Sequence, residues 1–244
     1  MNNLEKLLKE VFNSTSLSRA EKISKAENIL LQKLKENPLD EDIYFKLAVI
    51  VLEEPEVDFI KSMEYMKTVL SFNANNAEAA LFLSWIQYFH RGYTELDTIN
   101  LLDTYIADNE QNSLTKSLCY LAKSWSDEIS DVQKQCLLEK SIEVNNNYVS
   151  NYLSLANLYH LQENYKMEKS LITHALYNII WIVSTDDSFN SKSFEAFQGR
   201  NFKGIIQVAI DDVPNYSHFK NEFLLETTMN SYRLNKLLAY LKAL

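Results

Sequence analysis

Residues 138–159 read LEKSIEVNNNYVSNYLSLANLY, and this stretch carries the pattern that decides the fold. A run with helical apolar periodicity ends in three asparagines at 145–147. A second run begins immediately, and its aromatic, leucine and small positions are Tyr152, Leu155, Ala156 and Tyr159. Asparagine tolerates the left-handed conformation that ends many helices, and it can also cap the next helix. The stretch therefore predicts two helices joined by a very short turn.

The same pattern occurs three more times upstream, in residues 25–48, 63–84 and 101–122. Helices are predicted to end near residues 37, 73, 109 and 145, so that successive ends are 36 residues apart. A pattern that recurs at a fixed period of a few tens of residues indicates one structural unit repeated along the chain. The chain has 244 residues, 46% of them hydrophobic, but only 3 glycines and 3 prolines. Because sheets need turn residues, this composition also favours helices.

The pattern resembles the tetratricopeptide repeat, in which two antiparallel helices form each unit. The resemblance covers roughly residues 15–180, with about four repeats and atypical ends. It implies an all-α superhelix, or solenoid, over residues 1–184 and a C-terminal capping region over 185–244 that packs on the last repeat. In the second helix of each unit, the small contact position falls on Ala26, Ser62 and Thr98, whereas Lys134 and Glu168 depart from the pattern.

The two ends of the chain differ from the repeats. Residues 2–13 predict one amphipathic helix, whose apolar side is formed by Leu4, Leu7, Leu8, Val11 and Phe12. Residues 184–193 predict a loop, and residues 201–212 are compatible with a strand or with a short buried helix. A helical pattern returns from Ser217.

The net charge of −9 argues against a nucleic-acid binder, because such proteins normally present a basic face. It favours a basic or neutral protein partner. The first twelve residues mix lysine and glutamate among leucines, unlike a signal peptide, and no apolar run is long enough to span a membrane. Two cysteines, Cys119 and Cys136, are too few for a disulfide framework. We therefore expect a cytoplasmic protein that does not act at a membrane.

Motifs for catalysis are missing from the sequence. The four histidines are scattered, no cysteine–histidine cluster has metal spacing, and no nucleophile elbow or nucleotide-binding loop is present. Acidic clusters such as residues 53–58 and 127–131 fall in predicted turns, where solvated carboxylates are common. We therefore expect no enzymatic activity, no cofactor and no metal.

The resemblance implies that the first helix of each unit lines a concave binding face. The residues expected there are Phe45, Val49, Leu81, Trp85, Tyr88, Phe89, Lys116, Lys123, Asn157 and His160. An alternative is that the aromatic members pack against the chain's own C-terminal helix. Repeats that bind the acidic tails of heat-shock chaperones use a lysine and asparagine clamp, but Phe45 and Val49 stand at its first two positions here.

The sequence thus favours a non-catalytic scaffold that binds one protein partner. A narrower hypothesis is an immunity or inhibitor protein that neutralises a basic toxin or nuclease. The alternatives are a peptide-sensing regulator and an accessory subunit of an enzyme. The pattern leaves open the identity of the partner, the oligomeric state and the secondary structure of residues 185–215.

Overall fold

The computed structural model describes residues 3–52, 57–146, 148–171 and 174–175, and every regular element in these ranges is a helix. The chain divides into two compact units. Unit 1 comprises Met1–Leu101, and unit 2 begins at Leu102. None of the described helices is both long enough and apolar enough to cross a membrane.

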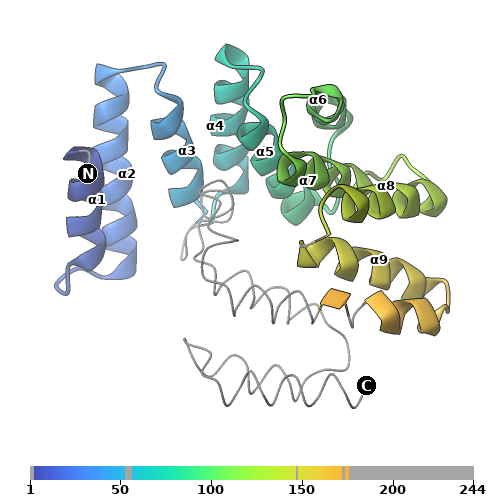
Figure 1. The fold of residues 1–244 in the computed structure, drawn as a ribbon. Helices are drawn as coiled ribbons and strands as arrows, with labels where there is room; N and C mark the ends of the chain where they lie inside the picture. Colours follow the sequence, from blue (N-terminus) through green and yellow to red (C-terminus); the bar gives the residue numbers. More distant parts are fainter. Residues whose placement is uncertain (1–2, 53–56, 147, 172–173, 176–244) are drawn as a thin grey trace. The chain divides into compact units, whose positions relative to one another are not determined.

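Unit 1 is a series of helices, each packed on the next (Figure 1). In chain order they are α1 (Asn3–Asn13), α2 (Arg19–Glu36), α3 (Glu41–Ile50), α4 (Phe59–Phe72) and α5 (Ala77–Arg91). The next helix, α6 (Leu96–Ala107), begins in unit 1 and ends in unit 2. Unit 2 continues with α7 (Ser113–Ser124), α8 (Asp131–Val144) and α9 (Val149–Leu161), and residues 165–171 are helical.

The 36-residue period is confirmed by the helix boundaries. The starts of alternate helices are spaced by that period: Glu41, Ala77, Ser113 and Val149. The intervening helices end at Glu36, Phe72, Ala107 and Val144, within two residues of the predicted ends. The stretch 138–159 therefore has the structure predicted from it: α8 ends, a short turn follows, and α9 begins.

The predicted role of the asparagines was partly wrong. Asn37, Asn73 and Asn145 do end their helices, but with φ of −138°, −140° and −146° they are not left-handed. The next helix is capped by a different residue. Asn76 and Asn112 each accept a hydrogen bond from a backbone N–H in the first turn of α5 and α7, as N-cap side chains do. The turn between α4 and α5 is therefore short, since Asn73, which ends one helix, and Asn76, which caps the next, lie three residues apart.

The asparagines also connect neighbouring helix pairs. Asn73 donates from Nδ2 to both carboxylate oxygens of Glu41, at 2.8 and 3.0 Å, and Asn76 donates to the same carboxylate at 2.7 Å. Glu41 opens α3, whereas the asparagines lie between α4 and α5. Their amides therefore hold the turn onto the preceding pair of helices.

The core of unit 1 follows the predicted pattern. Leu4 and Val11 of α1 pack in one buried cluster with residues of α2 and α3, whereas Phe12 is 42% exposed and lies outside it, contrary to the prediction. The small contact positions Ala26, Ser62 and Thr98 are all buried. The predictions for residues 176–244 lie outside the described residues; they concern the end of the array, the loop, the strand-or-helix segment and the capping region.

Candidate functional site

Five aromatic side chains of unit 1 form one connected series of rings, which we call the aromatic face: Phe45 of α3, and Phe82, Trp85, Tyr88 and Phe89 of α5. Residues three, four and seven apart share one side of a helix, which explains why the four α5 residues lie together. Four of the ten predicted binding residues, Phe45, Trp85, Tyr88 and Phe89, are thus brought together by the fold.

The rings form an unbroken series across two helices. Ring centroids are 6.1 Å apart for Phe45 and Phe82, 5.8 Å for Phe82 and Trp85, and 4.5 Å for Trp85 and Phe89. Tyr88 meets Phe89 edge-on at 6.0 Å. These spacings and tilts are those that aromatic pairs favour. Because each ring restrains the next, the face has little side-chain freedom to lose on binding.

Exposure increases along the aromatic face. Phe82 is buried and anchors it, Trp85 is half-buried, Tyr88 is 37% exposed and Phe89 is 55% exposed. Of the other predicted residues of unit 1, Val49 is half-buried, but Leu81 is only 4% exposed. Leu81 therefore packs in the core and offers almost no surface to a partner, contrary to the prediction.

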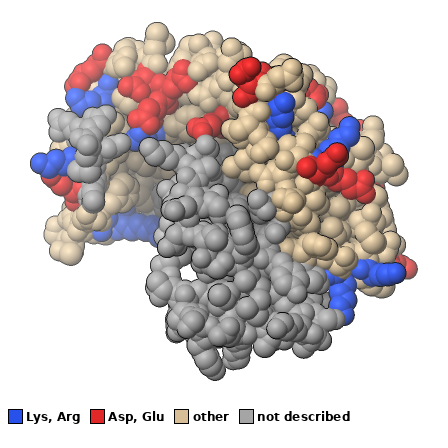
Figure 2. Space-filling view, in the orientation of Figure 1, with Lys and Arg blue, Asp and Glu red and all other residues tan. Residues whose placement is uncertain are grey.

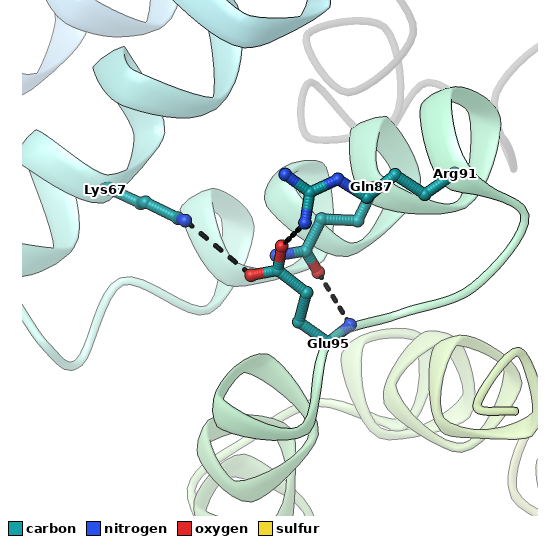
Figure 3. Close-up of polar contacts among 4 residues, drawn as sticks. All are labelled: Lys67, Gln87, Arg91 and Glu95. Atoms are coloured by element: carbon teal, nitrogen blue, oxygen red, sulfur yellow. Dashed lines mark hydrogen bonds and ion pairs between the residues drawn. The ribbon is translucent and has the colours of Figure 1, made fainter. Parts of the chain in front are cut away.

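A polar cluster holds the turn that follows the aromatic face (Figure 3). The buried Gln87 accepts a hydrogen bond from the backbone N–H of Glu95 at 3.2 Å. The Glu95 carboxylate pairs with Arg91 of the same segment and lies 3.6 Å from the amine of Lys67 on α4. Sequence reasoning missed this cluster, although a glutamine on the apolar side of α5 is a signal that could have revealed it.

The predicted binding residues of unit 2 form no comparable surface. Lys123 is half-buried and pairs with Asp103 of α6, and Lys116 is half-buried. Asn157 is exposed at α9, and the His160 ring lies 3.1 Å from the Glu168 carboxylate. Lys123 and His160 therefore pair with side chains of their own unit, unlike the exposed aromatic residues of unit 1.

Unit 2 instead contains a buried polar cluster that sequence reasoning missed. Ser117, Ser141 and Asn151 are each fully buried. The hydroxyl of Ser141 donates to the backbone carbonyl of Ser117 at 2.6 Å, and the Asn151 amide donates to the Ser117 hydroxyl at 2.8 Å. The cluster joins α7, α8 and α9, and its inaccessibility makes it structural.

Burial keeps two titratable side chains of unit 2 in their neutral forms at neutral pH. Burial raises the pKa of Cys119 to about 12, so this thiol is protonated at neutral pH and is a poor nucleophile. Burial likewise raises the pKa of Tyr105 to about 12. No three histidine, cysteine, aspartate or glutamate side chains among the described residues are grouped as metal ligands. On the face drawn in Figure 2, acidic and basic side chains are intermingled.

Comparison with known proteins identifies the fold. No family model matches the chain, and no curated protein sequence matches it. A crystal structure of MamA matches with a TM-score of 0.52 and 16% identity, over 76% of this chain and 99% of MamA. The structure of MamA 41-end from Desulfovibrio magneticus RS-1 matches with a TM-score of 0.51 and 13% identity. This match covers 77% of this chain and 99% of the other. MamA is a tetratricopeptide-like protein, and this chain shares its all-helical repeat fold.

Proposed function

We propose that this protein is a non-catalytic scaffold that binds a protein partner through the aromatic face of unit 1. The observation that supports this is the exposed end of the ring series, where Tyr88 and Phe89 are 37% and 55% exposed. Exposed apolar groups of this kind mark binding sites, and a few aromatic side chains usually supply most of the binding energy of an interface. The rigid base beneath them lowers the entropic cost of binding.

We also propose a family for this chain. We assign residues 15–180 to tetratricopeptide-type repeats, about four in number. The 36-residue spacing of the helix starts and the helical-repeat fold of MamA support this assignment. Proteins of this architecture commonly bind partners on the face formed by the first helix of each repeat. Here those helices include α3 and α5.

The narrower hypothesis, an inhibitor that neutralises a basic toxin or nuclease, stays a prediction. It is motivated by the net charge of −9 alone. If a basic partner is held electrostatically, its association should slow as salt rises, because exposed charges are screened beyond about 10 Å at 0.1 M ionic strength. The cytoplasmic location and the absence of a bound cofactor remain predictions as well.

The test compares partners retained by the tagged full-length protein and by three variants, using quantitative mass spectrometry. Tyr88→Ala and Phe89→Ala change the aromatic face, and Val132→Ala is a matched control, because Val132 of α8 is an apolar side chain that is 75% exposed in unit 2. A partner should be lost from the first two variants and retained by the third. Calorimetry with that partner should then show a loss of about 2 kcal/mol or more for Phe89→Ala.

Circular dichroism and thermal melting establish that each variant is folded. Since Phe89 is more than half exposed, its removal should leave stability nearly unchanged. If the folded variants retain every partner of the wild-type protein, the aromatic face is not the binding surface and the proposal is wrong.

A further inference from the structure

The aromatic face ends in an exposed carboxylate on both of its helices. Asp42 lies three residues before Phe45 on α3, and Glu78 lies four residues before Phe82 on α5. Residues with these spacings share one side of a helix. Asp42 and Glu78 are also 36 residues apart, so they occupy equivalent positions in successive repeats. Both carboxylates therefore lie at the N-terminal end of the aromatic face.

These carboxylates are available to a partner in different degrees. The side chain of Asp42 is 65% exposed and pairs with Lys46 on its own helix. Glu78 is exposed and makes no ion pair with any side chain that the structure describes. An acidic residue in the first turn suits the helix dipole in any helix. Here, however, the same residue also gives the apolar face a negatively charged end.

The dimensions of α5 set the size of the segment that would fit. Glu78 and Trp85 are seven residues apart, which is about 10 Å along a helix and about three residues of extended chain. Glu78 and Phe89 are eleven residues apart, or about 16 Å, which about five extended residues span. A short segment can therefore contact the rings and the carboxylate together.

We infer that the partner segment carries a lysine or arginine within about three to five residues of an aromatic or aliphatic side chain. The apolar side chain packs on Trp85 and Phe89, and the cation lies beside Glu78. Charge at the edge of an interface selects between partners and speeds association. This inference rests on the proposed function, because it assigns a chemistry to what the aromatic face binds.

The experiment selects random peptides of about 12 residues, displayed on phage, against the immobilised full-length protein. Synthetic versions of the enriched peptides are then titrated into the wild-type protein and three variants. Phe89→Ala tests the rings, Glu78→Lys reverses the charge, and Glu64→Lys is the matched control. Glu64 is an exposed carboxylate of unit 1 on α4, which does not contribute to the aromatic face.

The enriched peptides should combine an apolar residue with a nearby lysine or arginine. Glu78→Lys should weaken their binding about fivefold or more, since it removes an exposed ion pair and adds a repulsion. Glu64→Lys should leave the affinity unchanged. A selection repeated on Glu78→Lys should lose the preference for basic residues.

Three results overturn the inference, and they separate it from the proposed function. In the first, Phe89→Ala weakens binding of the enriched peptides, but the peptides are not enriched in basic residues and Glu78→Lys leaves their affinity unchanged. This result would disprove the partner chemistry and support the aromatic face. In the second, Phe89→Ala leaves the affinity of every enriched peptide unchanged, which would disprove both the partner chemistry and the proposed function. A synthetic peptide of residues 217–241 that binds through Phe89 more tightly than any selected peptide would identify the chain's own segment as the occupant instead.

Discussion

The α3–α4 pair of unit 1 and the α7–α8 pair of unit 2 occupy equivalent positions, 72 residues apart, but are joined at opposite ends. In α3–α4, the Ser62 hydroxyl donates to the backbone carbonyl of Ala48 at 2.8 Å. In α7–α8, Ser117 and Ser141 each donate to the other's carbonyl, at 2.9 and 2.6 Å. The first contact involves the end of α3 and the start of α4, and the second involves the start of α7 and the end of α8.

Side-chain size explains this difference. The position equivalent to Ser62 holds Lys134 in unit 2. Conversely, the position equivalent to Ser141 holds Val69 in unit 1. The distance between two packed helices depends on the side chains at their contact, and a hydroxyl reaches the neighbouring backbone where both residues are small. The comparison shows that the repeat period sets where helices begin and end, whereas the small residues set where they touch.

The largest effect is expected from placing a large side chain at the unit 2 contact, with Ser117→Phe. Overpacking costs about 1–3 kcal/mol, and the buried backbone carbonyl of Ser141 and side-chain amide of Asn151 each lose their hydrogen bond with the Ser117 hydroxyl. Together these should lower the free energy of unfolding by about 3 kcal/mol or more. Urea denaturation measures this, with Ser117→Ala as the control. If the two variants were equally stable, Ser117 would not lie at a close contact.

A smaller effect is expected from removing the two hydroxyls in a double-mutant cycle. Ser117→Ala and Ser141→Ala should each cost about 1 kcal/mol or more, because each removes a buried hydroxyl that donates to the neighbouring helix. The double variant should cost less than their sum by about 0.5 kcal/mol or more, since both changes remove the contact between the two hydroxyl oxygens, which lie 3.0 Å apart. Ser117→Ala combined with Ser62→Ala of unit 1 is the matched control, and those costs should be additive. Additivity in both pairs would contradict the direct contact between the Ser117 and Ser141 hydroxyls.

The turns after α5 and α9 can also be compared between the units. Both have a residue with positive φ: Gly92 at 85° in unit 1 and Glu163 at 59° in unit 2. An added Cβ at Gly92 meets nothing within 4 Å, so Gly92→Ala should cost about 1 kcal/mol from backbone strain alone. Glu163→Gly should raise stability by about 0.5 kcal/mol, because relief of strain exceeds the added freedom of the unfolded chain. Thermal melting of both variants checks the two signs, and the same sign in both would refute the explanation.

The last prediction concerns the rates of thiol labelling. It reports on packing and involves no change in stability. Cys119 is buried on α7, and Cys136 is exposed on α8. With the pKa of Cys119 raised to about 12, only about one thiol in ten thousand is ionised at pH 8. Iodoacetamide should therefore label Cys136 first, as followed by peptide mass spectrometry. Ser117→Phe should speed labelling of Cys119, and rapid labelling in the wild-type protein would mean that unit 2 opens readily.

Several features of the fold and the site followed from sequence alone. The spacing of apolar runs gave the helix boundaries, because helical periodicity and helix ends are local properties of the chain. Phe45, Trp85, Tyr88 and Phe89 were found from their place in the repeat, since residues at helical spacing share one side. The positions of the asparagine turns were also predicted correctly, but Asn73 has φ near −140° and not the expected left-handed conformation.

The tertiary structure decided what depends on contacts between distant residues. Leu81 was expected on the binding face with Phe89, but in the folded chain it is only 4% exposed. Likewise, Ser117 and Ser141 are 24 residues apart, and their hydrogen bonds exist because α7 and α8 approach closely there. Helical periodicity states which residues share a side of one helix, but it does not state which side chains a second helix covers. For that physical reason the sequence determined the repeats and the aromatic series, and packing decided their exposure and the joints between helices.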